Sequence, residues 1–362
     1  MGSTFGTIFK TTTFGESHGS GVGAVVDGCP AGITISVDEI QLQLERRRPG
    51  QSRLSTPRQE SDEVEILSGV EDGLTLGTPI GLLVRNRNQK PGDYRKMADI
   101  PRPSHADYSY RMKYGLTSSS GGGRASARET LARVAAGSVA EQFLRAVFGV
   151  EIVAWVSQVG AVELDLNESE FKDFSRSEVD NAIVRCPDRQ KADLMTLAIE
   201  RAAAAKDSLG GVISCFCRNV PAGWGEPVFD KLDALLAQAM ISIPAAKGFV
   251  SGSGFAAALM TGFAHNDRFV KDGSGLKTKT NFSGGVQGGI SNGQLIHFKV
   301  AFKPVPTIGR AQKTADYEGR EVVLEGKGRH DPCVVPRAVP IVEAMAALTL
   351  ADLALRQRST RF

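Results

Sequence analysis

The chain has 362 residues, of which 41% are hydrophobic and 23% are charged, as is usual for globular proteins with a sizeable core. Its net charge of +3 is small against 43 basic and 40 acidic side chains, so overall charge argues against a general nucleic-acid or membrane binder. The five cysteines are scattered, which favours a reducing compartment. The sequence shows no signal peptide and no uncharged apolar run long enough to cross a bilayer, so we expect a cytoplasmic protein.

The first predicted element is a strand from Phe5 to Phe14, which leads into the loop Gly15-Glu16-Ser17-His18-Gly19. Glycines on both sides of this loop permit a sharp turn and the close approach of a ligand. Its histidine titrates near neutral pH and can transfer a proton. The apolar run from Val22 to Val26 predicts a buried strand behind the loop. Two interpretations stay open, a reactive loop or an ordinary hairpin whose histidine caps a turn.

Ser36 with Glu39 three residues later forms a capping-box pattern, and the apolar spacing that follows predicts a helix to about Arg47. Short strands are predicted at 64–67 and 80–84. The other predicted helices cover 126–148, 190–206, 229–240 and about 336–357, and the other predicted strands cover 151–159, 212–220 and 295–302.

The tripeptide Pro-Ala-Gly occurs twice, at 30–32 and 221–223, each time between a predicted strand and an amphipathic helix. This echo suggests a duplicated architecture, and a chance match in an alanine- and glycine-rich chain is the alternative. No linker separates the two halves, so we expect one domain over residues 1–362.

Five arginines crowd one short segment: Arg46, Arg47, Arg48, Arg53 and Arg58. The planar guanidinium grips carboxylates and phosphates through two parallel hydrogen bonds, so the segment favours a polyanionic small molecule. Two alternatives stay open. Basic residues complement the dipole at a helix C-terminus, and a nucleic-acid patch is possible in principle, although no aromatic residues interleave for base stacking.

A second anion site is predicted at Gly121-Gly122-Gly123-Arg124-Ala125-Ser126-Ala127-Arg128, where glycines and arginines meet a helix N-terminus. Ser126 is equally a good N-cap, which needs no ligand. The pattern is neither a Walker loop nor a dinucleotide turn.

None of the five histidines has the spacing of a zinc site. His265 and His297 are interpreted as structural. His18, His105 and His330 lie in loops bounded by glycine or proline, each beside an acid or an arginine, where shifted pKa values arise. For the last of these, in Gly328-Arg329-His330-Asp331-Pro332, a solvated loop is the alternative.

Along nearly its whole length the chain resembles the chorismate synthase family. The resemblance rests on five motifs in the right order, each of them weak alone. They are 15–30, beginning Gly-Glu-Ser-His-Gly; Arg46-Arg47-Arg48-Pro49-Gly50-Gln51-Ser52-Arg53; 123–137, beginning Gly-Arg-Ala-Ser-Ala-Arg-Glu-Thr; Lys303-Pro304-Val305-Pro306-Thr307; and Arg329-His330-Asp331-Pro332-Cys333.

The resemblance implies an anti 1,4-elimination of phosphate from 5-enolpyruvylshikimate 3-phosphate, which yields chorismate. It also implies dependence on reduced FMN (FMNH2), although the reaction is redox-neutral overall, with NADPH as a possible reductant of the flavin. A substrate with two carboxylates and a phosphate would account for many arginines in a chain of low net charge.

The resemblance also implies roles for individual residues. His18 would protonate the departing phosphate, His105 would stabilise the reduced flavin, and Asp331 would help to take a proton from the flavin. The implied substrate ligands are Arg47, Arg48, Arg53, Arg128 and Arg329. The implied FMN contacts are Arg124, Ala125, Ser126, Pro244, Ala245, Gly288, Lys303, Pro304, Val305, Pro306, Thr307 and Arg329. The family assigns Arg47 and Arg53 to NADPH as well, and two ligands cannot share these arginines at once.

The fold implied by the resemblance is α+β, a single-domain β-α-β sandwich with antiparallel sheets and internal pseudo-two-fold symmetry, assembled as a homotetramer. Pro244 departs from the Asn-Ala pair of many bacterial members and has no N–H to donate to a flavin. Partners other than the small-molecule substrate, such as nucleic acid or a membrane, are not expected. The alternatives are a non-catalytic flavin- or phosphoanion-binding module and a nucleic-acid binder that uses the Arg46 to Arg58 segment.

Overall fold

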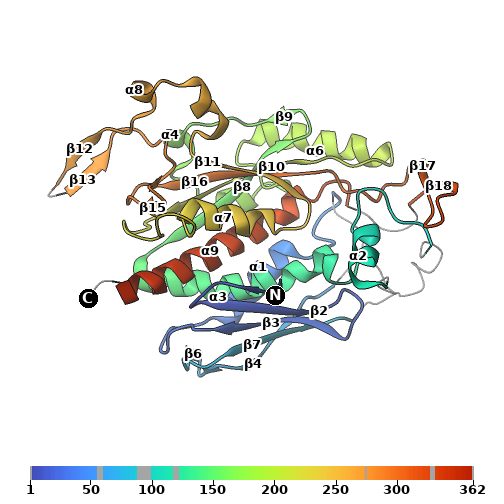
Figure 1. Ribbon diagram of the computed structural model, residues 1–362, viewed down its shortest axis with the longest axis horizontal. Helices are drawn as coiled ribbons and strands as arrows, with labels where there is room; N and C mark the ends of the chain where they lie inside the picture. Colours follow the sequence, from blue (N-terminus) through green and yellow to red (C-terminus); the bar gives the residue numbers. More distant parts are fainter. Residues whose placement is uncertain are drawn as a thin grey trace.

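A computed structural model describes residues 2–54, 60–87, 99–116, 122–273, 275–326 and 331–360. Two five-stranded antiparallel sheets enclose a central layer of helices (Figure 1). The expected α+β class with antiparallel sheets is therefore confirmed, and the layers follow the order sheet, helices, sheet.

The first sheet comes from the N-terminal part of the chain and has the strand order β1-β2-β3-β7-β4. Its central strand β3 (Gly21–Asp27) is almost entirely buried, as the valine-rich run predicts. The expected strand from Phe5 to Phe14 is divided into two. The bounds of the other strands are β1 (Thr4–Phe5), β2 (Lys10–Gly15), β4 (Val64–Ser68) and β7 (Ile80–Arg85).

The second sheet has the order β11-β16-β10-β8-β9 and also pairs antiparallel throughout. Three of its strands are long and apolar and match the predicted ones. The bounds are β8 (Glu151–Val159), β9 (Val162–Glu163), β10 (Gly211–Arg218), β11 (Ala246–Ser251) and β16 (Ile296–Phe302).

Three helices form the central layer: α1 (Val37–Arg47), α3 (Thr130–Phe148) and α9 (Val335–Thr360). Helix α3 starts four residues later than predicted, because Ala127–Glu129 form a separate 3-10 turn, η3. Helices α3 and α9 pack so closely that a Cβ added to Gly137 would lie 2.4 Å from the Cβ of Ala344.

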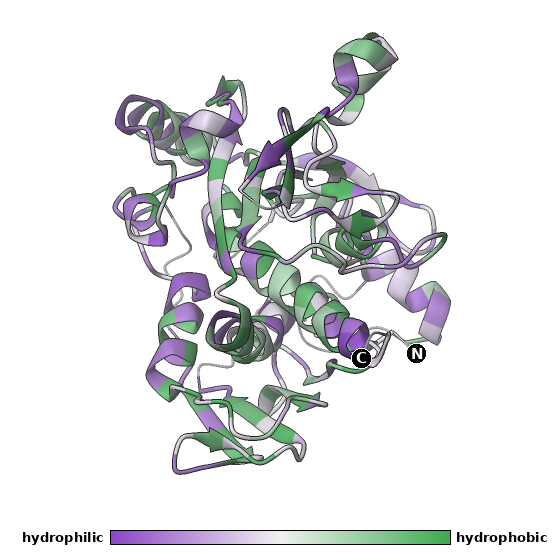
Figure 2. Ribbon diagram, turned by 90° about the vertical axis from the view of Figure 1, so that its left-hand side faces the viewer, coloured by the Kyte–Doolittle hydropathy of each residue, from purple (hydrophilic) through white to green (hydrophobic). Residues whose placement is uncertain are grey.

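Helix α9 is long and apolar enough to cross a membrane by length and composition, the only such helix in the described ranges. Its apolar stretch is 94% buried within the protein. In Figure 2 it is the largely green helix that ends at the C label, in the middle of the molecule. Because α1, α3 and strands β8 and β10 pack against it, its apolarity is that of a core helix.

Ser36 caps α1 as predicted, with its hydroxyl accepting from the Glu39 N–H at 3.3 Å. The second half of the capping box does not form. The Glu39 carboxylate instead accepts from Arg145 at 2.7 Å, and the Ser36 N–H donates to Gln142 at 2.7 Å. Arg145 and Gln142 on α3 have thus replaced the expected hydrogen bond between the Ser36 N–H and the Glu39 side chain.

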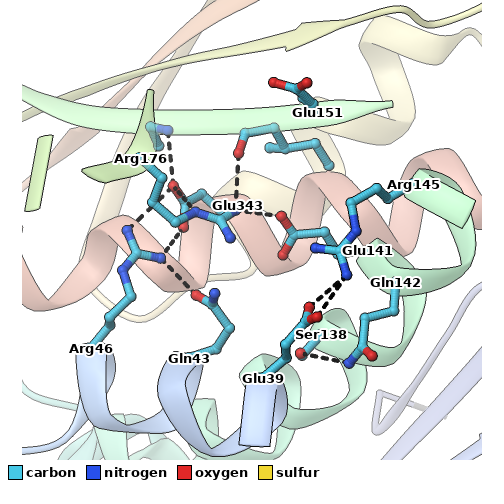
Figure 3. Close-up of polar contacts among 12 residues, drawn as sticks. Glu39, Gln43, Arg46, Ser138, Glu141, Gln142, Arg145, Glu151, Arg176 and Glu343 are labelled. Carbon is cyan, nitrogen blue, oxygen red and sulfur yellow. Dashed lines mark hydrogen bonds and ion pairs between the residues drawn. The ribbon is translucent and has the colours of Figure 1, made fainter. Parts of the chain in front are cut away.

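A buried ionic cluster connects the helices to the second sheet (Figure 3). Glu343 on α9 accepts from Arg46 on α1 at 2.5 Å and from the Ala154 N–H on β8 at 3.0 Å. Arg176 lies 3.5 Å from Glu343 and pairs with Glu141 on α3. The side chain of Glu343 is only 2% exposed. Burial alone would raise the pKa of Glu343, but Arg176 and Arg46 hold it below its usual value.

The remaining elements lie around this frame. The helices are α2 (Asp107–Tyr114), α4 (Glu168–Phe171), α5 (Arg176–Asp180), α6 (Arg189–Ala204), α7 (Leu232–Ile241) and α8 (Gly262–His265), with 3-10 helices η2 (Gly123–Ala125) and η4 (Gly254–Leu259). The two-stranded ribbons are β5 (Val70–Glu71) with β6 (Leu74–Thr75), β12 (Phe269–Asp272) with β13 (Gly275–Thr278), β14 (Val286–Gln287) with β15 (Ile290–Ser291), and β17 (Gln312–Ala315) with β18 (Glu321–Leu324). The segment carrying α8, β12 and β13 projects away from the body (Figure 1).

Candidate active site

A cavity of about 620 Å³ lies where loops of both sheets meet the ends of the central helices. This volume is in the range of small-molecule and cofactor sites. Of the residues to which the family resemblance assigns a role, twelve line it. They are His18, Arg47, His105, Ala125, Ser126, Pro244, Ala245, Lys303, Val305, Pro306, Thr307 and Asp331.

His18 reaches the cavity from the turn between β2 and β3. Gly15 has a φ of +89°, and a Cβ there would lie 2.1 Å from the Gly21 carbonyl oxygen, so only glycine fits this narrow turn. The Ser17 hydroxyl lies 3.0 Å from Nδ1 of His18. The turn is held from outside by Asn86, whose amide donates to two of its carbonyls. His18 is therefore presented on a fixed support.

His105 enters from the loop before α2. Its Nδ1 lies 2.7 Å from Oδ1 of Asp107, and Arg102 donates to both oxygens of the same carboxylate at 2.7 and 2.8 Å. Burial raises the pKa of Asp107, but hydrogen bonds from Arg102 and His105 outweigh that effect and hold it well below its usual value. Lys303 donates to the Ser104 hydroxyl at 2.7 Å and so joins this loop to the second sheet.

The neighbouring arginines of α1 diverge. Arg46 enters the buried cluster with Glu343, whereas Arg47 donates to Asp62 at 2.9 Å and lines the cavity. Arg48 lines a different cavity of about 510 Å³, and Arg53 pairs with Glu200 at the surface. Arg46 and Arg47 are buried, so neither belongs to an exposed basic patch of the kind that a nucleic-acid interface needs. Arg58 lies outside the described residues.

Arg128 is buried beside Arg47 and donates to the same carboxylate, that of Asp62, at 3.0 Å. Arg124 donates to the Thr13 hydroxyl at 2.6 Å and to the Gly15 carbonyl at 3.1 Å. Neither arginine lines the 620 Å³ cavity; each ties a cavity loop to a neighbouring element.

The opposite wall is formed by the residues after α7 and after β16. Ala245 has a φ of +69°, and its carbonyl accepts from the Lys303 N–H at 2.9 Å, which aligns the two predicted flavin-contact segments. Burial, and to a lesser degree Lys247, lowers the pKa of the Lys303 ammonium. Pro304 and Gly288 do not line the cavity, and Gly288 lies in the turn between β14 and β15. Arg329 and His330 lie outside the described residues.

Asp331 forms an ion pair with Arg337 in the first turn of α9, and the Arg337 Nε donates to the Arg47 carbonyl at 3.1 Å.

The sequence analysis did not single out three basic residues that line the cavity: Arg102, Lys247 and Arg337. A clue existed for Arg102, which stands between two prolines near His105. Nothing local marks Lys247 or Arg337, because a single basic residue in a strand or helix is ordinary.

The side chains that line the cavity suit a flavin phosphate and an anionic substrate. The lining combines the apolar side chains of Ile241, Ile243, Pro244 and Phe302 with the cationic groups of Arg47, Arg102 and Lys303. At Gly122 an added Cβ would lie 3.3 Å from Cε1 of His105, so the backbone comes close to the imidazole there. Within the described ranges no group of three His, Cys, Asp or Glu side chains could hold a metal ion.

The sequence profile described as chorismate synthase matches residues 9–355. The chain belongs to the chorismate synthase family. It is 56% identical to chorismate synthase of Prochlorococcus marinus (strain MIT 9211) over 99% of this chain and 98% of that protein. It is 57% identical to chorismate synthase of Gloeothece citriformis (strain PCC 7424), with 98% of both chains covered. A crystal structure of chorismate synthase matches with a TM-score of 0.75 and 34% identity, covering 96% of this chain and 91% of that one.

As a chorismate synthase, the protein is a carbon-oxygen lyase that eliminates phosphate from 5-enolpyruvylshikimate 3-phosphate to give chorismate. The family requires reduced FMN. Membership therefore confirms the family, the function and the small-molecule substrate expected from the sequence motifs.

Proposed function

We propose that the elimination takes place in the 620 Å³ cavity, with His18, His105 and Asp331 as its proton-handling groups. The observation that carries this proposal is that these three side chains, distant in sequence, line one cavity together with cationic Arg47 and Lys303. A substrate with three acidic groups needs such cations, and an elimination needs a proton donor for the leaving phosphate.

In this proposal the imidazole of His18 donates a proton to the phosphate oxygen as the C–O bond breaks. The Ser17 hydroxyl, 3.0 Å from Nδ1, orients the ring. Arg47 holds the anionic substrate through a guanidinium that Asp62 keeps in place. The carboxylate of Asp331, held by Arg337, accepts a proton in the same cavity.

Reduced FMN, when bound, supplies transient electron density for cleavage of the C–H bond. We place its contacts at Ala125, Ser126, Pro244, Ala245 and the segment 303–307. Pro244 adds an apolar surface there and has no N–H to donate. Arg124 and Arg128 act behind this wall, as supports of the loops. Direct contacts of Arg48, Arg53, Arg329, Pro304 and Gly288 with ligands remain predictions from the family resemblance.

The test is an anaerobic assay with chemically reduced FMN and 5-enolpyruvylshikimate 3-phosphate that follows chorismate absorbance. We expect His18→Ala to lower turnover by roughly 10²–10⁴-fold with little change in substrate binding, as for loss of a general acid. His265→Ala is the matched control, because His265 pairs with Ser253 outside the cavity. Near-normal turnover of His18→Ala would remove His18 from the mechanism.

We further propose that NADPH can serve as the flavin reductant and that Arg47 contacts it at a separate stage from the substrate. The same anaerobic assay, run with oxidised FMN and with or without NADPH, tests this. Chorismate formation that depends on NADPH supports it. Absence of NADPH oxidation would show that the reductant must come from elsewhere.

We also propose a cytoplasmic homotetramer built from single-domain subunits. Side chains on the projecting segment support self-association, since Phe255, Leu259 and Phe263 are 86%, 92% and 87% exposed. Pseudo-two-fold symmetry is part of this proposal. The two Pro-Ala-Gly turns follow β3 and β10, the middle strands of the two sheets, and precede α1 and α7. Light scattering in solution tests the tetramer.

A further inference from the structure

The loop that carries His105 holds a carboxylate against its imidazole. Nδ1 of His105 lies 2.7 Å from Oδ1 of Asp107 and 3.1 Å from Nη2 of Arg102. Arg102 itself donates through Nε to Oδ2 and through Nη2 to Oδ1 of Asp107. All three side chains are mostly buried. Both of these contacts of the His105 ring involve Nδ1, and among the described residues no hydrogen bond to Nε2 of His105 is found.

These contacts decide which ring nitrogen carries the hydrogen. A guanidinium nitrogen only donates, and an ionised carboxylate only accepts. Asp107 is ionised, because Arg102 and His105 hold its pKa well below the usual value despite burial. The two neighbours of Nδ1 make opposite demands, since Arg102 would need it as an acceptor and Asp107 needs it as a donor. The contact to the carboxylate is the shorter one, at 2.7 Å against 3.1 Å, and Nη2 of Arg102 already donates to Oδ1 of Asp107 at 2.8 Å. We therefore assign Nδ1 as the N–H donor to Asp107, and the neutral ring carries its hydrogen there.

The carboxylate is itself fixed. The backbone N–H of Arg102 donates to Oδ2 of Asp107 at 3.1 Å. The backbone N–H of His105 donates to the backbone carbonyl of Arg102 at 3.2 Å, so the loop closes on itself. Ser104 has a φ of +59° and is anchored by Lys303. The pair is thus preorganised before any ligand arrives.

We propose that Asp107 is a positioning residue that locks His105 in the Nδ1–H form, leaving Nε2 to take up and hold a proton facing the cavity. The carboxylate also stabilises the imidazolium once Nε2 is protonated, as in other carboxylate–imidazole pairs. This proposal rests on the proposed role of His105 in the reaction. It explains why an acid lies within hydrogen-bond distance of this histidine.

The test replaces Asp107 by asparagine. Oδ2 of Asp107 accepts from both the backbone N–H and Nε of Arg102, so we expect the amide oxygen of Asp107→Asn to take that position. The NH₂ group then takes the Oδ1 position and faces His105. Nδ1 must then accept, and the ring hydrogen moves to Nε2. NMR of the ligand-free protein with ¹⁵N-labelled histidine reads this directly. We expect an Nδ1–H signature in the wild type and an Nε2–H signature in the variant.

The activity readout uses the reduced-flavin assay. We expect kcat of Asp107→Asn to fall by roughly 10²-fold or more, with KM little changed. Glu168→Gln is the matched control, since its carboxylate lies 4.0 Å from Nε2 of His297 outside the cavity. It should change neither the His105 spectrum nor kcat.

The two readouts separate the possible failures. An Nε2–H signature in the wild type, or an unchanged spectrum in Asp107→Asn, would overturn the positioning role of Asp107. The wild-type spectrum gives this answer even if the variant does not fold. If the spectra change as expected while kcat stays the same, the assignment of His105 to the reaction is wrong.

Discussion

Removing the charge of Glu343 should destabilise the protein more than removing any exposed carboxylate. In Glu343→Gln the two guanidinium groups of Arg46 and Arg176 lose the carboxylate that lies between them. Breaking a buried pair by removing one partner costs about 3–5 kcal/mol. At the usual unfolding entropy per residue, a chain of 362 residues then loses about 4–7 °C in Tm.

The control is Glu39→Gln, which breaks the exposed Glu39–Arg145 pair drawn in the same view (Figure 3). Exposed pairs contribute about 0–1 kcal/mol, so its Tm should fall by no more than roughly 1–2 °C. Calorimetry or a thermal fluorescence scan measures both variants. Equal shifts in the two proteins would refute the argument that burial makes the Glu343 cluster critical.

The pH dependence supplies a second check. The folded protein holds the pKa of Glu343 below its unfolded value, so the stabilisation is present above the unfolded pKa of about 4.3 and is lost as pH falls through the folded pKa. The difference in Tm between wild type and Glu343→Gln should therefore be constant from about pH 6 to 8 and should narrow below about pH 4. A difference that widens in acid would contradict the assignment.

The other predictions concern packing and the arginines. Gly137→Ala places a Cβ 2.4 Å from the Cβ of Ala344 and should cost about 1–3 kcal/mol in a denaturant titration, whereas Gly262→Ala, with open space around it, should be neutral or slightly stabilising. A neutral Gly137→Ala would mean that α3 and α9 can separate freely. Arg47→Lys should raise KM by roughly 10-fold or more, the worth of a charged hydrogen bond, and Arg48→Lys should raise it less, because only Arg47 lines the 620 Å³ cavity. The reverse order would place the substrate in the 510 Å³ cavity.

Strongly periodic segments could be predicted because local spacing alone defines their buried face. The helices at α3, α6 and α9 and the strands at β3, β8, β10 and β16 lie within a few residues of the predicted positions. Strand β11 and the short ribbons could not be predicted, since their pattern carries few apolar residues and their pairing depends on distant partners. Likewise Glu39 forms its ion pair with α3, a contact that no local pattern contains.

The arginine cluster shows why the site could be predicted only in part. The sequence groups Arg46, Arg47 and Arg48 as one anion-binding set, but successive residues at a helix end point in directions about 100° apart. The structure places Arg47 in the candidate active site. Arg46 and Arg48 line a separate cavity, and Arg46 also joins the buried ionic cluster. Residue type predicted the chemistry, whereas direction depended on partners such as Asp62 and Glu343, which come from other parts of the chain.

The low net charge of the chain and its highly anionic substrate are reconciled by where the central helices begin. Ser126, Ala127 and Thr130, at and just before the start of α3, line the same cavity as Val334, Arg337 and Ala338, around the start of α9. A helix N-terminus carries partial positive charge, which favours phosphates and carboxylates without adding any basic residue. Because two helices begin there beside Arg47, Lys303 and Arg337, we expect the cavity to attract anions even though the acidic and basic residues of the whole chain nearly cancel.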